Sequence, residues 1–148
     1  MNIRKAKQED INNGLLEVFI EGYRYHQNGR PDIFTINSNE ELKKDLLRIF
    51  ESDSIIVITN DNNILGYLSY KIKEKRVKLM DIDQLVIKEN VRGQGLGRRL
   101  MEEAKKIAKD NNCVRIVFNC WYFNENAIKA YDHMGFKRQR IMYEMILE

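Results

Sequence analysis

The chain has 148 residues, of which 43% are apolar and 32% are charged. This length predicts a single domain over residues 1–148, large enough to bury a core without disulfides or a structural metal. The composition is typical of a globular protein and excludes a disordered one, and no apolar run approaches the ~20 residues of a transmembrane helix. The first ten residues lack the apolar stretch of a signal peptide, so we expect a cytoplasmic protein that does not bind a membrane.

The net charge of +3 is too small to indicate a nucleic-acid partner. It is unevenly distributed, because residues 1–75 carry 11 basic and 12 acidic side chains, whereas residues 76–148 carry 14 basic and 10 acidic ones. We therefore expect any anionic ligand to bind the second half. The two cysteines, Cys113 and Cys120, have the spacing of neither a zinc site nor a redox motif, so we expect reduced thiols and no metal.

Residues 1–87 predict a short strand, two helices and three further strands. We expect a strand at residues 3–6 and a helix that begins after Asp10 and presents one apolar face up to Gly22. Residues 26–35 are interpreted as a loop because they contain glycine and proline. A second helix begins at the capping box Ser38–Glu41. Three antiparallel strands follow, at residues 54–59, 64–73 and 77–87.

The second half predicts one crossover unit followed by a helix and a strand. A glycine-rich loop over residues 91–97 leads from the strand at 77–87 into a helix that begins at Arg98. The next strand, at 114–120, is expected to lie parallel to the strand at 77–87, because a helix connects the two. A helix at 124–134 and a last strand at 142–147 complete a mixed sheet covered by helices.

The strongest chemical signal lies in the segment Arg92-Gly93-Gln94-Gly95-Leu96-Gly97. Alternating glycines let backbone N–H groups converge on one centre, and the start of the following helix adds unpaired donors and partial positive charge. This arrangement favours an anion such as a pyrophosphate, with a ligand-free glycine turn as the alternative. The residues after the loop exclude a P-loop, and the glycine spacing excludes a dinucleotide fingerprint.

Two blocks of sequence resemble the GNAT family, the GCN5-related N-acetyltransferases. Residues 92–97 are similar to the family's R/Q-x-x-G-x-G/A acetyl-CoA signature, and residues 124–136 are similar to its N-x-x-A-x-x-x-Y-x-x-x-G-F segment. The order of the predicted elements is also that of the family. The resemblance implies a mixed α/β (α+β) GNAT fold. Its sheet would be twisted and mostly antiparallel, with six or seven strands, a central parallel pair splayed at the cofactor site and about four flanking helices.

The resemblance also implies acetyl-CoA as the co-substrate, without a metal. The CoA pyrophosphate would lie on the glycine loop and on the start of the next helix, and the pantetheine arm would pair with the strand before the loop. The acetyl thioester would then lie between the splayed strands. The cofactor-binding residues implied by the family are Leu85, Val86, Ile87, Arg92, Gly93, Gln94, Gly95, Leu96, Gly97, Arg98, Asn124, Ala127 and Tyr131.

The implied reaction is the direct attack of a primary amine on the acetyl thioester. Tyr131 matches the family tyrosine that protonates the leaving thiolate. Keeping a lysine-like amine neutral at pH 7 costs about 4–5 kcal/mol, so a general base or a water relay is needed. Asp83 and Asp81 share a strand face and are the candidate bases. Gln84 takes the place of Asp83 if the alignment shifts by one residue, and a solvent-facing carboxylate without a catalytic role is the other alternative.

In this family the region after the first helix shapes the acceptor pocket. Tyr25, His26 and Phe34 from this region, and Trp121 after the splayed strand, are therefore predicted to bind the substrate. An ordinary surface loop, or core packing for Trp121, is the alternative. We expect a small-molecule amine as the acceptor. Acetylation of a protein lysine or N-terminus, and a non-catalytic acyl-CoA-binding module, are the competing hypotheses. A homodimer is an open alternative, since many members of the family dimerise.

Overall fold

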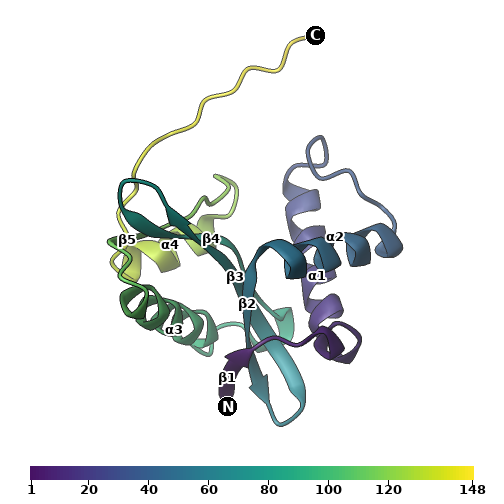
Figure 1. Ribbon diagram of the computed structural model, residues 1–148. Coiled ribbons are helices and arrows are strands. Elements are labelled where there is room, and N and C mark those ends of the chain that lie inside the picture. Colours follow the sequence, from purple (N-terminus) through teal and green to yellow (C-terminus); the bar gives the residue numbers. More distant parts are fainter.

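A computed structural model describes residues 1–148, and its framework is a five-stranded mixed sheet (Figure 1). The strands follow one another in space as in the chain: β1 (Asn2–Lys5), β2 (Ser54–Asn60), β3 (Asn63–Glu74), β4 (Lys78–Ile87) and β5 (Arg115–Val117). The pairs from β1 to β4 are antiparallel, and β4 pairs with β5 in parallel. Short turns join β2 to β3 and β3 to β4, whereas a helix connects the parallel pair.

Helices cover both faces of the sheet. The helices α1 (Leu15–Gly29) and α2 (Asn39–Ser52) lie on one face, and α3 (Leu96–Asp110) lies on the other (Figure 1). The helix α4 (Glu125–His133) packs on the α3 side through Tyr131 and the following Met134. Two short 3-10 helices, η1 (Gln8–Asn13) and η2 (Glu89–Val91), join these elements. No helix combines the length and the apolarity that crossing a membrane requires.

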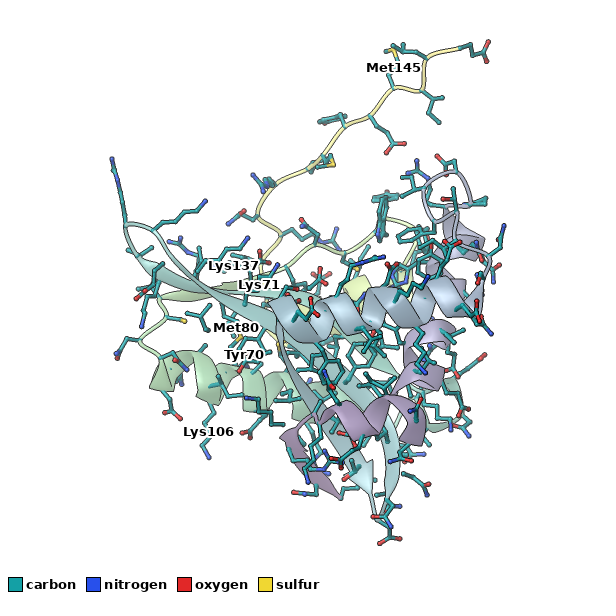
Figure 2. The ribbon with its side chains drawn as sticks, turned by 45° about the vertical axis from the view of Figure 1, so that its right-hand side comes forward. Tyr70, Lys71, Met80, Lys106, Lys137 and Met145 are labelled. Carbon is teal, nitrogen blue, oxygen red and sulfur yellow. The ribbon has the colours of Figure 1, made fainter.

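The β-branched run of β2 explains why both faces are covered. Successive side chains of a strand point to opposite faces, so Ile56 and Ile58 pack on the α3 side with Leu100. Val57 packs on the other side with Leu15 of α1. The side chains in Figure 2 fill the layers on both sides of the sheet. The sheet is therefore the middle layer of a three-layer domain.

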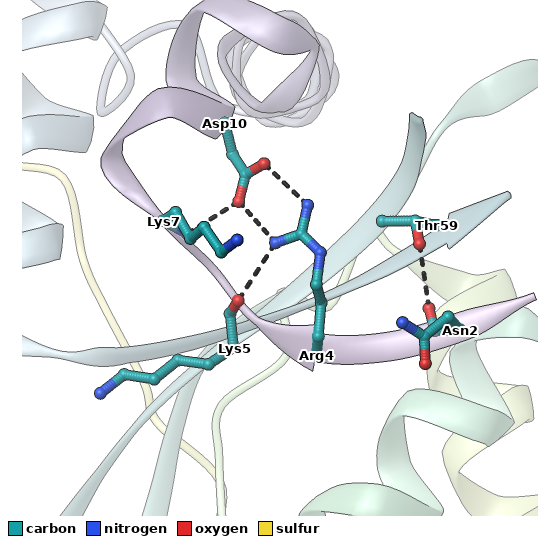
Figure 3. Close-up of polar contacts among 6 residues, drawn as sticks. All are labelled: Asn2, Arg4, Lys5, Lys7, Asp10 and Thr59. Atoms are coloured by element: carbon teal, nitrogen blue, oxygen red, sulfur yellow. Dashed lines mark hydrogen bonds and ion pairs between the residues drawn. The ribbon is translucent and has the colours of Figure 1, made fainter. Parts of the chain in front are cut away.

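The β1 edge is held by a partly buried ion pair (Figure 3). Arg4 donates from both terminal nitrogens to the two carboxylate oxygens of Asp10, each at 2.8 Å, and the backbone N–H of Lys7 donates to the same carboxylate at 2.7 Å. Because the guanidinium of Arg4 stabilises the charged form, it lowers the pKa of Asp10, which is only 6% exposed. Thr59 adds a hydrogen bond from its hydroxyl to the carbonyl of Asn2. This edge of the sheet is tied to η1 and to β2.

The predicted number of strands is corrected from six or seven to five. The strand expected at 142–147 is absent, because residues 137–148 form an exposed, extended tail that pairs with no strand (Figure 1). The strand expected at 114–120 shortens to Arg115–Val117. The parallel pair consequently lies at an edge of the sheet rather than at its centre, since no strand follows β5.

Three helix boundaries also differ from the prediction. A 3-10 turn precedes α1, and Gly14 separates the two with a φ of +119°. The helix α1 then continues to Gly29, so His26 lies on a helix and not in a loop. The helix ends there because Pro31 disfavours the helical conformation of the residue before it. The helix α3 begins at Leu96 rather than Arg98, because Gly95 adopts the left-handed conformation immediately before it.

Candidate functional site

The strands β4 and β5 separate after three paired residues. Leu79–Asp81 pair with Arg115–Val117, and from Ile82 onward β4 has β3 on one side and no strand on the other. A strand edge without a partner presents backbone N–H and C=O groups that can bind an extended ligand. The predicted cofactor residues Leu85, Val86 and Ile87 lie on this free edge. The separation matches the splayed pair that the family resemblance implies, although the pair lies at an edge of the sheet and not at its centre.

The glycine loop lies at the end of this free edge. Gly93 and Gly95 have φ angles of +80° and +78°, and no atom lies within 4 Å of the place where a Cβ would stand at either position. The loop therefore faces open space. The first hydrogen bond of α3 runs from the Arg99 N–H to the Gly95 carbonyl, so the N–H groups before Arg99 have no partner within the helix. These groups fit an anionic ligand such as a pyrophosphate.

Two exposed arginines flank the glycine loop. Arg92 and Arg98 take part in no ion pair, so their positive charges are free to meet an anion. The Nε of Arg92 donates to the carbonyl of Ile87 at 3.0 Å, which holds this side chain beside the free edge. No group of three or more His, Cys, Asp or Glu side chains has the arrangement to hold a metal ion.

Tyr131 lies on α4, four residues after Ala127, and packs against the segment that follows β5. Its ring centroid is 4.6 Å from that of Phe118 and 6.2 Å from that of Phe136. Burial, together with the nearby Cys120, raises the pKa of Tyr131 to about 12. The phenol therefore keeps its proton at neutral pH. Burial also raises the pKa of Cys120, which disfavours a nucleophilic thiolate at that position.

A bulge in the β3–β4 pairing places the candidate base Asp83. Ser69 pairs with Gln84 and the next residue, Tyr70, pairs with Ile82, so Asp83 has no opposite residue. The Gln84 Oε1 accepts a hydrogen bond from the Tyr67 hydroxyl at 2.6 Å. Burial raises the pKa of that hydroxyl, and the negative charge of the Asp83 carboxylate raises it further. Asp83 and Gln84 therefore both face the α1–α2 side.

The surroundings of Asp83 favour its protonated form. Its side chain reaches solvent, but neighbouring protein removes part of its hydration and so raises the pKa of the carboxyl. The negative charge of Asp53 acts in the same direction, while Lys71 opposes it. A raised pKa is a property of general bases that must accept a proton near neutral pH.

The second candidate base, Asp81, has a different environment. Its Oδ2 lies 2.7 Å from the Nζ of Lys73, so its charge is already paired. It also belongs to the part of β4 that still pairs with β5, before the strands separate. The two carboxylates share a strand, but only Asp83 lies beyond the point of separation.

The four predicted substrate-binding residues meet in one aromatic cluster. His26 lies 5.7 Å from Tyr25 and 5.4 Å from Phe34, measured between ring centroids, and Phe34 lies 5.5 Å from Trp121. Tyr25 and His26 reach the cluster from α1, Phe34 from the following loop, and Trp121 from the segment after β5. The fold therefore assembles residues that are almost 100 positions apart in the chain.

Phe123 stands at the centre of this cluster and was not among the predicted substrate residues. Its ring centroid lies 6.0 Å from that of Tyr25, 5.9 Å from His26 and 6.2 Å from Trp121, on which it stacks. The absence of a side chain at Gly29 leaves room for the Phe123 ring, because a Cβ at residue 29 would lie 2.3 Å from that ring. The only sequence signal is that Phe123 directly precedes the block that begins at Asn124.

Tyr25 connects the aromatic cluster to the candidate cofactor residues. Its hydroxyl donates to the Oδ1 of Asn124 at 3.1 Å. The guanidinium carbon of Arg92 lies 5.8 Å from the centre of its ring, which is within the range of a cation–π contact. The two predicted halves of the site are therefore neighbours at Tyr25.

Comparisons with known proteins agree with this geometry. The sequence pattern of the acetyltransferase (GNAT) family matches residues 18–136. An uncharacterized N-acetyltransferase of Archaeoglobus fulgidus is 26% identical over 133 residues, which cover 85% of this chain and 84% of that protein. Glucosamine 6-phosphate N-acetyltransferase 1 of Dictyostelium discoideum is 28% identical over 90 residues, covering 58% and 55% of the two chains. The crystal structure of the BH1408 protein tetramutant from Bacillus halodurans has the same fold, with a TM-score of 0.87 at 23% identity over 99% and 100% of the chains.

Several of these likenesses are partial. The chain spans between 30% and 57% of the length of four curated relatives that it matches. The family match, in contrast, extends over most of the chain and contains both sequence blocks and every candidate site residue. This chain is therefore a member of the acetyltransferase (GNAT) family.

Proposed function

We propose that the chain is an acetyl-CoA-dependent N-acetyltransferase whose acceptor is a primary amine on a small molecule. The observation that carries this proposal is the separation of β4 from β5, with the open glycine loop beyond the end of β4. The aromatic cluster adjoins the same region through Tyr25. An extended anionic co-substrate and an amine could thus approach each other from two sides of one split.

Bound acetyl-CoA would supply the activated acetyl group. The backbone of residues 93–97 and the free N–H groups of α3 would hold its pyrophosphate, with Arg92 and Arg98 adding positive charge. Each N–H bond to a charged phosphate contributes about 1.5–3 kcal/mol. The free edge of Leu85–Ile87 would align the pantetheine arm as an added strand. A backbone N–H of Val86 or Ile87 would stabilise the negative charge that develops on the acetyl oxygen.

Asp83 and Tyr131 would move the protons. Asp83 would accept a proton from the incoming ammonium or through a water, which its raised pKa and its access to solvent favour. Tyr131 would donate a proton to the departing thiolate, since its pKa of about 12 keeps the phenol protonated at neutral pH. The ion pair with Lys73 makes Asp81 the weaker candidate base.

The aromatic cluster supports a small acceptor. Its rings come from α1, the following loop and the segment after β5, and they pack against one another in a compact cluster. The relative from Dictyostelium is named for transfer to an amino sugar phosphate. Both observations favour a small amine over a protein lysine or N-terminus.

A turnover screen tests this proposal. The purified chain is incubated with acetyl-CoA and separate panels of amino acids, polyamines, amino sugars and lysine-containing or free-N-terminal peptides, and released thiol is measured. We expect at least one small amine to raise thiol release above the rate without an acceptor. Turnover of peptides alone would replace the small acceptor with a protein. CoA binding without turnover of any amine would instead indicate an acyl-CoA-binding module, and no CoA binding at millimolar concentration would contradict the proposal.

A further inference from the structure

Arg30 binds two carboxylates at the point where α1 ends. Its Nε and one terminal nitrogen donate to the carboxylate of Asp32 at 3.0 and 2.8 Å. Both terminal nitrogens donate to the carboxylate of Glu144, at 3.1 and 2.7 Å. No other arginine of the chain forms ion pairs with more than one carboxylate. The guanidinium of Arg30 therefore has one side for a neighbour in its own loop and a second side for a carboxylate from elsewhere.

The surroundings of Arg30 fix the position of its guanidinium. Its backbone N–H donates to the carbonyl of His26 at 2.9 Å, and its own carbonyl accepts from the N–H groups of Ile33 and Phe34 at 3.1 and 3.0 Å. The guanidinium carbon lies 5.5 Å from the centre of the Trp121 ring, which is within the range of a cation–π contact. The side chain of Arg30 is only 23% exposed. Arg30 is thus held by a hydrogen-bonded turn and an aromatic ring, unlike a freely moving surface arginine.

The two carboxylates on Arg30 are held in place to different degrees. Asp32 lies two residues from Arg30, within the same turn, so the chain itself keeps the pair together. Glu144 belongs to the C-terminal tail, where no backbone hydrogen bond involves residues 137–148, and its side chain is 53% exposed. A segment with so few contacts opens at little cost in free energy. The carboxylate of Glu144 is therefore the one that another carboxylate can replace.

Arg30 lies beside the proposed acceptor side of the site. Trp121, on whose ring Arg30 lies, is part of the aromatic cluster. Phe118, three residues before Trp121, packs on Tyr131 with 4.6 Å between the ring centroids. Three residues of chain span at most about 10 Å. A carboxylate on Arg30 is therefore separated from the proposed proton donor by a length that a short amino acid can bridge.

We propose, building on the proposed function, that Arg30 binds a carboxylate of the acceptor and that the acceptor is an amino acid. Glu144 occupies the same place when no acceptor is bound. The incoming carboxylate takes over the two hydrogen bonds that Glu144 releases, so no donor of the partly buried Arg30 is left without a partner. Asp32 keeps the guanidinium oriented throughout the exchange. Arg30 is then a specificity-determining residue, and Glu144 is a competitor that the chain itself supplies.

Matched pairs of acceptors test this inference on the full chain. Amino acids from glycine to 6-aminohexanoate are compared with their carboxamides, which have the same length but no negative charge, and kcat/KM is measured for each. The variants are Arg30→Gln, Glu144→Gln and the control Arg138→Gln, which removes an arginine that also holds a carboxylate, Asp132, through two hydrogen bonds.

A second measurement does not depend on turnover. Trp121 is the only tryptophan of the chain, so its fluorescence reports which carboxylate lies on Arg30. Each variant is titrated with the amino acids and with the carboxamides, and circular dichroism establishes that each variant is folded.

We expect the kcat/KM of the best amino acid to exceed that of its carboxamide by roughly tenfold or more, because its hydrogen bonds to Arg30 are charged. Arg30→Gln should bring this ratio close to one, and Arg138→Gln should leave it unchanged. Glu144→Gln should raise kcat/KM by roughly threefold for the amino acid and not for the carboxamide, because the competing carboxylate is gone. The Trp121 fluorescence should change saturably with amino acids only, and not in Arg30→Gln.

The outcomes separate this inference from the proposed function. Equal kcat/KM for amino acids and carboxamides, or a preference that survives in Arg30→Gln, would overturn the inference and leave the N-acetyltransferase intact. A fluorescence change that requires both the carboxylate and Arg30, without turnover of any amine, would support the carboxylate site and contradict the proposed function. Unchanged amino-acid kinetics in Glu144→Gln would overturn the role of Glu144 as a competitor. Neither binding nor turnover would overturn both proposals.

Discussion

The two sides of the split between β4 and β5 are built from different kinds of chemical group. On the proposed cofactor side, the candidate groups are the backbone of residues 93–97 and the first N–H groups of α3. On the proposed acceptor side, they are aromatic rings from α1, the loop after it and residues 121–123, which pack against one another. A site made of backbone depends on a few glycines at fixed spacing, whereas a site made of rings depends on how distant segments pack. We therefore expect that the proposed acceptor side can change its specificity without disturbing the proposed cofactor side.

The largest effect is expected from placing a carboxylate in the glycine loop. Gly95→Glu should weaken the affinity for CoA by roughly 100-fold or more, because negative charge would replace a cradle of N–H donors. Isothermal titration calorimetry with CoA measures this. Gly135→Glu is the matched control, since Gly135 also has a positive φ, +92°, and open space around it, but lies after α4. Equal affinities of the two variants would show that the loop does not hold the cofactor.

The next effect concerns Tyr131, the proposed proton donor. Tyr131→Phe removes the phenol but keeps the ring that packs on Phe118, so we expect kcat to fall by roughly 100-fold. The KM for acetyl-CoA should change little, because the hydroxyl acts only on the leaving thiolate. Tyr122→Phe, at a side chain that is 90% exposed, is the control and should keep the wild-type kcat. An unchanged kcat in Tyr131→Phe at saturating substrates would remove Tyr131 from the mechanism.

A smaller effect separates the two candidate bases. Asp83→Asn should lower kcat/KM by roughly tenfold, less than the usual contribution of a general base, because water reaches the exposed Asp83 and can substitute for it. Asp81→Asn should have little effect, since Lys73 already pairs with that carboxylate. The same loss in both variants would assign the effect to net charge rather than to a base at Asp83.

The pH dependence of kcat/KM also distinguishes the two candidate bases. The base form of Asp83 exists only above its pKa, which its surroundings raise. In the wild type, kcat/KM should therefore fall as the pH drops through this raised value, at a higher pH than for an ordinary aspartate. The Asp83→Asn variant should lack this acid limb, and the Asp81→Asn variant should keep it. An acid limb that survives in Asp83→Asn would belong to another group.

The glycine loop and the block around Tyr131, which form the proposed cofactor side, could be located from the sequence because their patterns are local. The glycine loop occupies six consecutive residues, and Asn124, Ala127 and Tyr131 recur at helical spacing within one short block. For the proposed acceptor side, the sequence indicated which segments contribute but not the conformation or the role of each residue. The pattern placed His26 in a loop although it lies on α1, and it gave no role to Phe123, whose central position depends on contact with Gly29.

Sequence patterns also fail to predict the structure where it depends on which strands pair with each other. Residues 142–147 have the composition of a strand, but no strand of the same chain pairs with them. The length of β5 likewise depends on where β4 diverges, which no local pattern encodes. The bulge beside Asp83 is a further case, because the register shift arises between two strands and is not visible in either one.

The smallest predicted effect tests whether the acceptor side can change alone. Gly29→Ala places a Cβ where it would lie 2.3 Å from the Phe123 ring, so the ring must move within a cluster that includes Tyr25, His26 and Trp121. The KM for the acceptor amine should rise by roughly fivefold, because small displacements of positioning groups weaken productive binding. The affinity for CoA should stay at the wild-type value, since the glycine loop is untouched.

The matched control for this variant is Asn28→Ala, one residue earlier on α1 and exposed to solvent. Both substitutions introduce alanine on the same helix and both raise its helix propensity, so an effect of helix propensity alone should appear in both variants. Only Gly29→Ala should alter the acceptor KM. Calorimetry with CoA and acceptor titrations at saturating acetyl-CoA measure the two sides separately. A loss of CoA affinity in Gly29→Ala would show that the two sides are coupled, through the hydrogen bond from Tyr25 to Asn124, rather than independent.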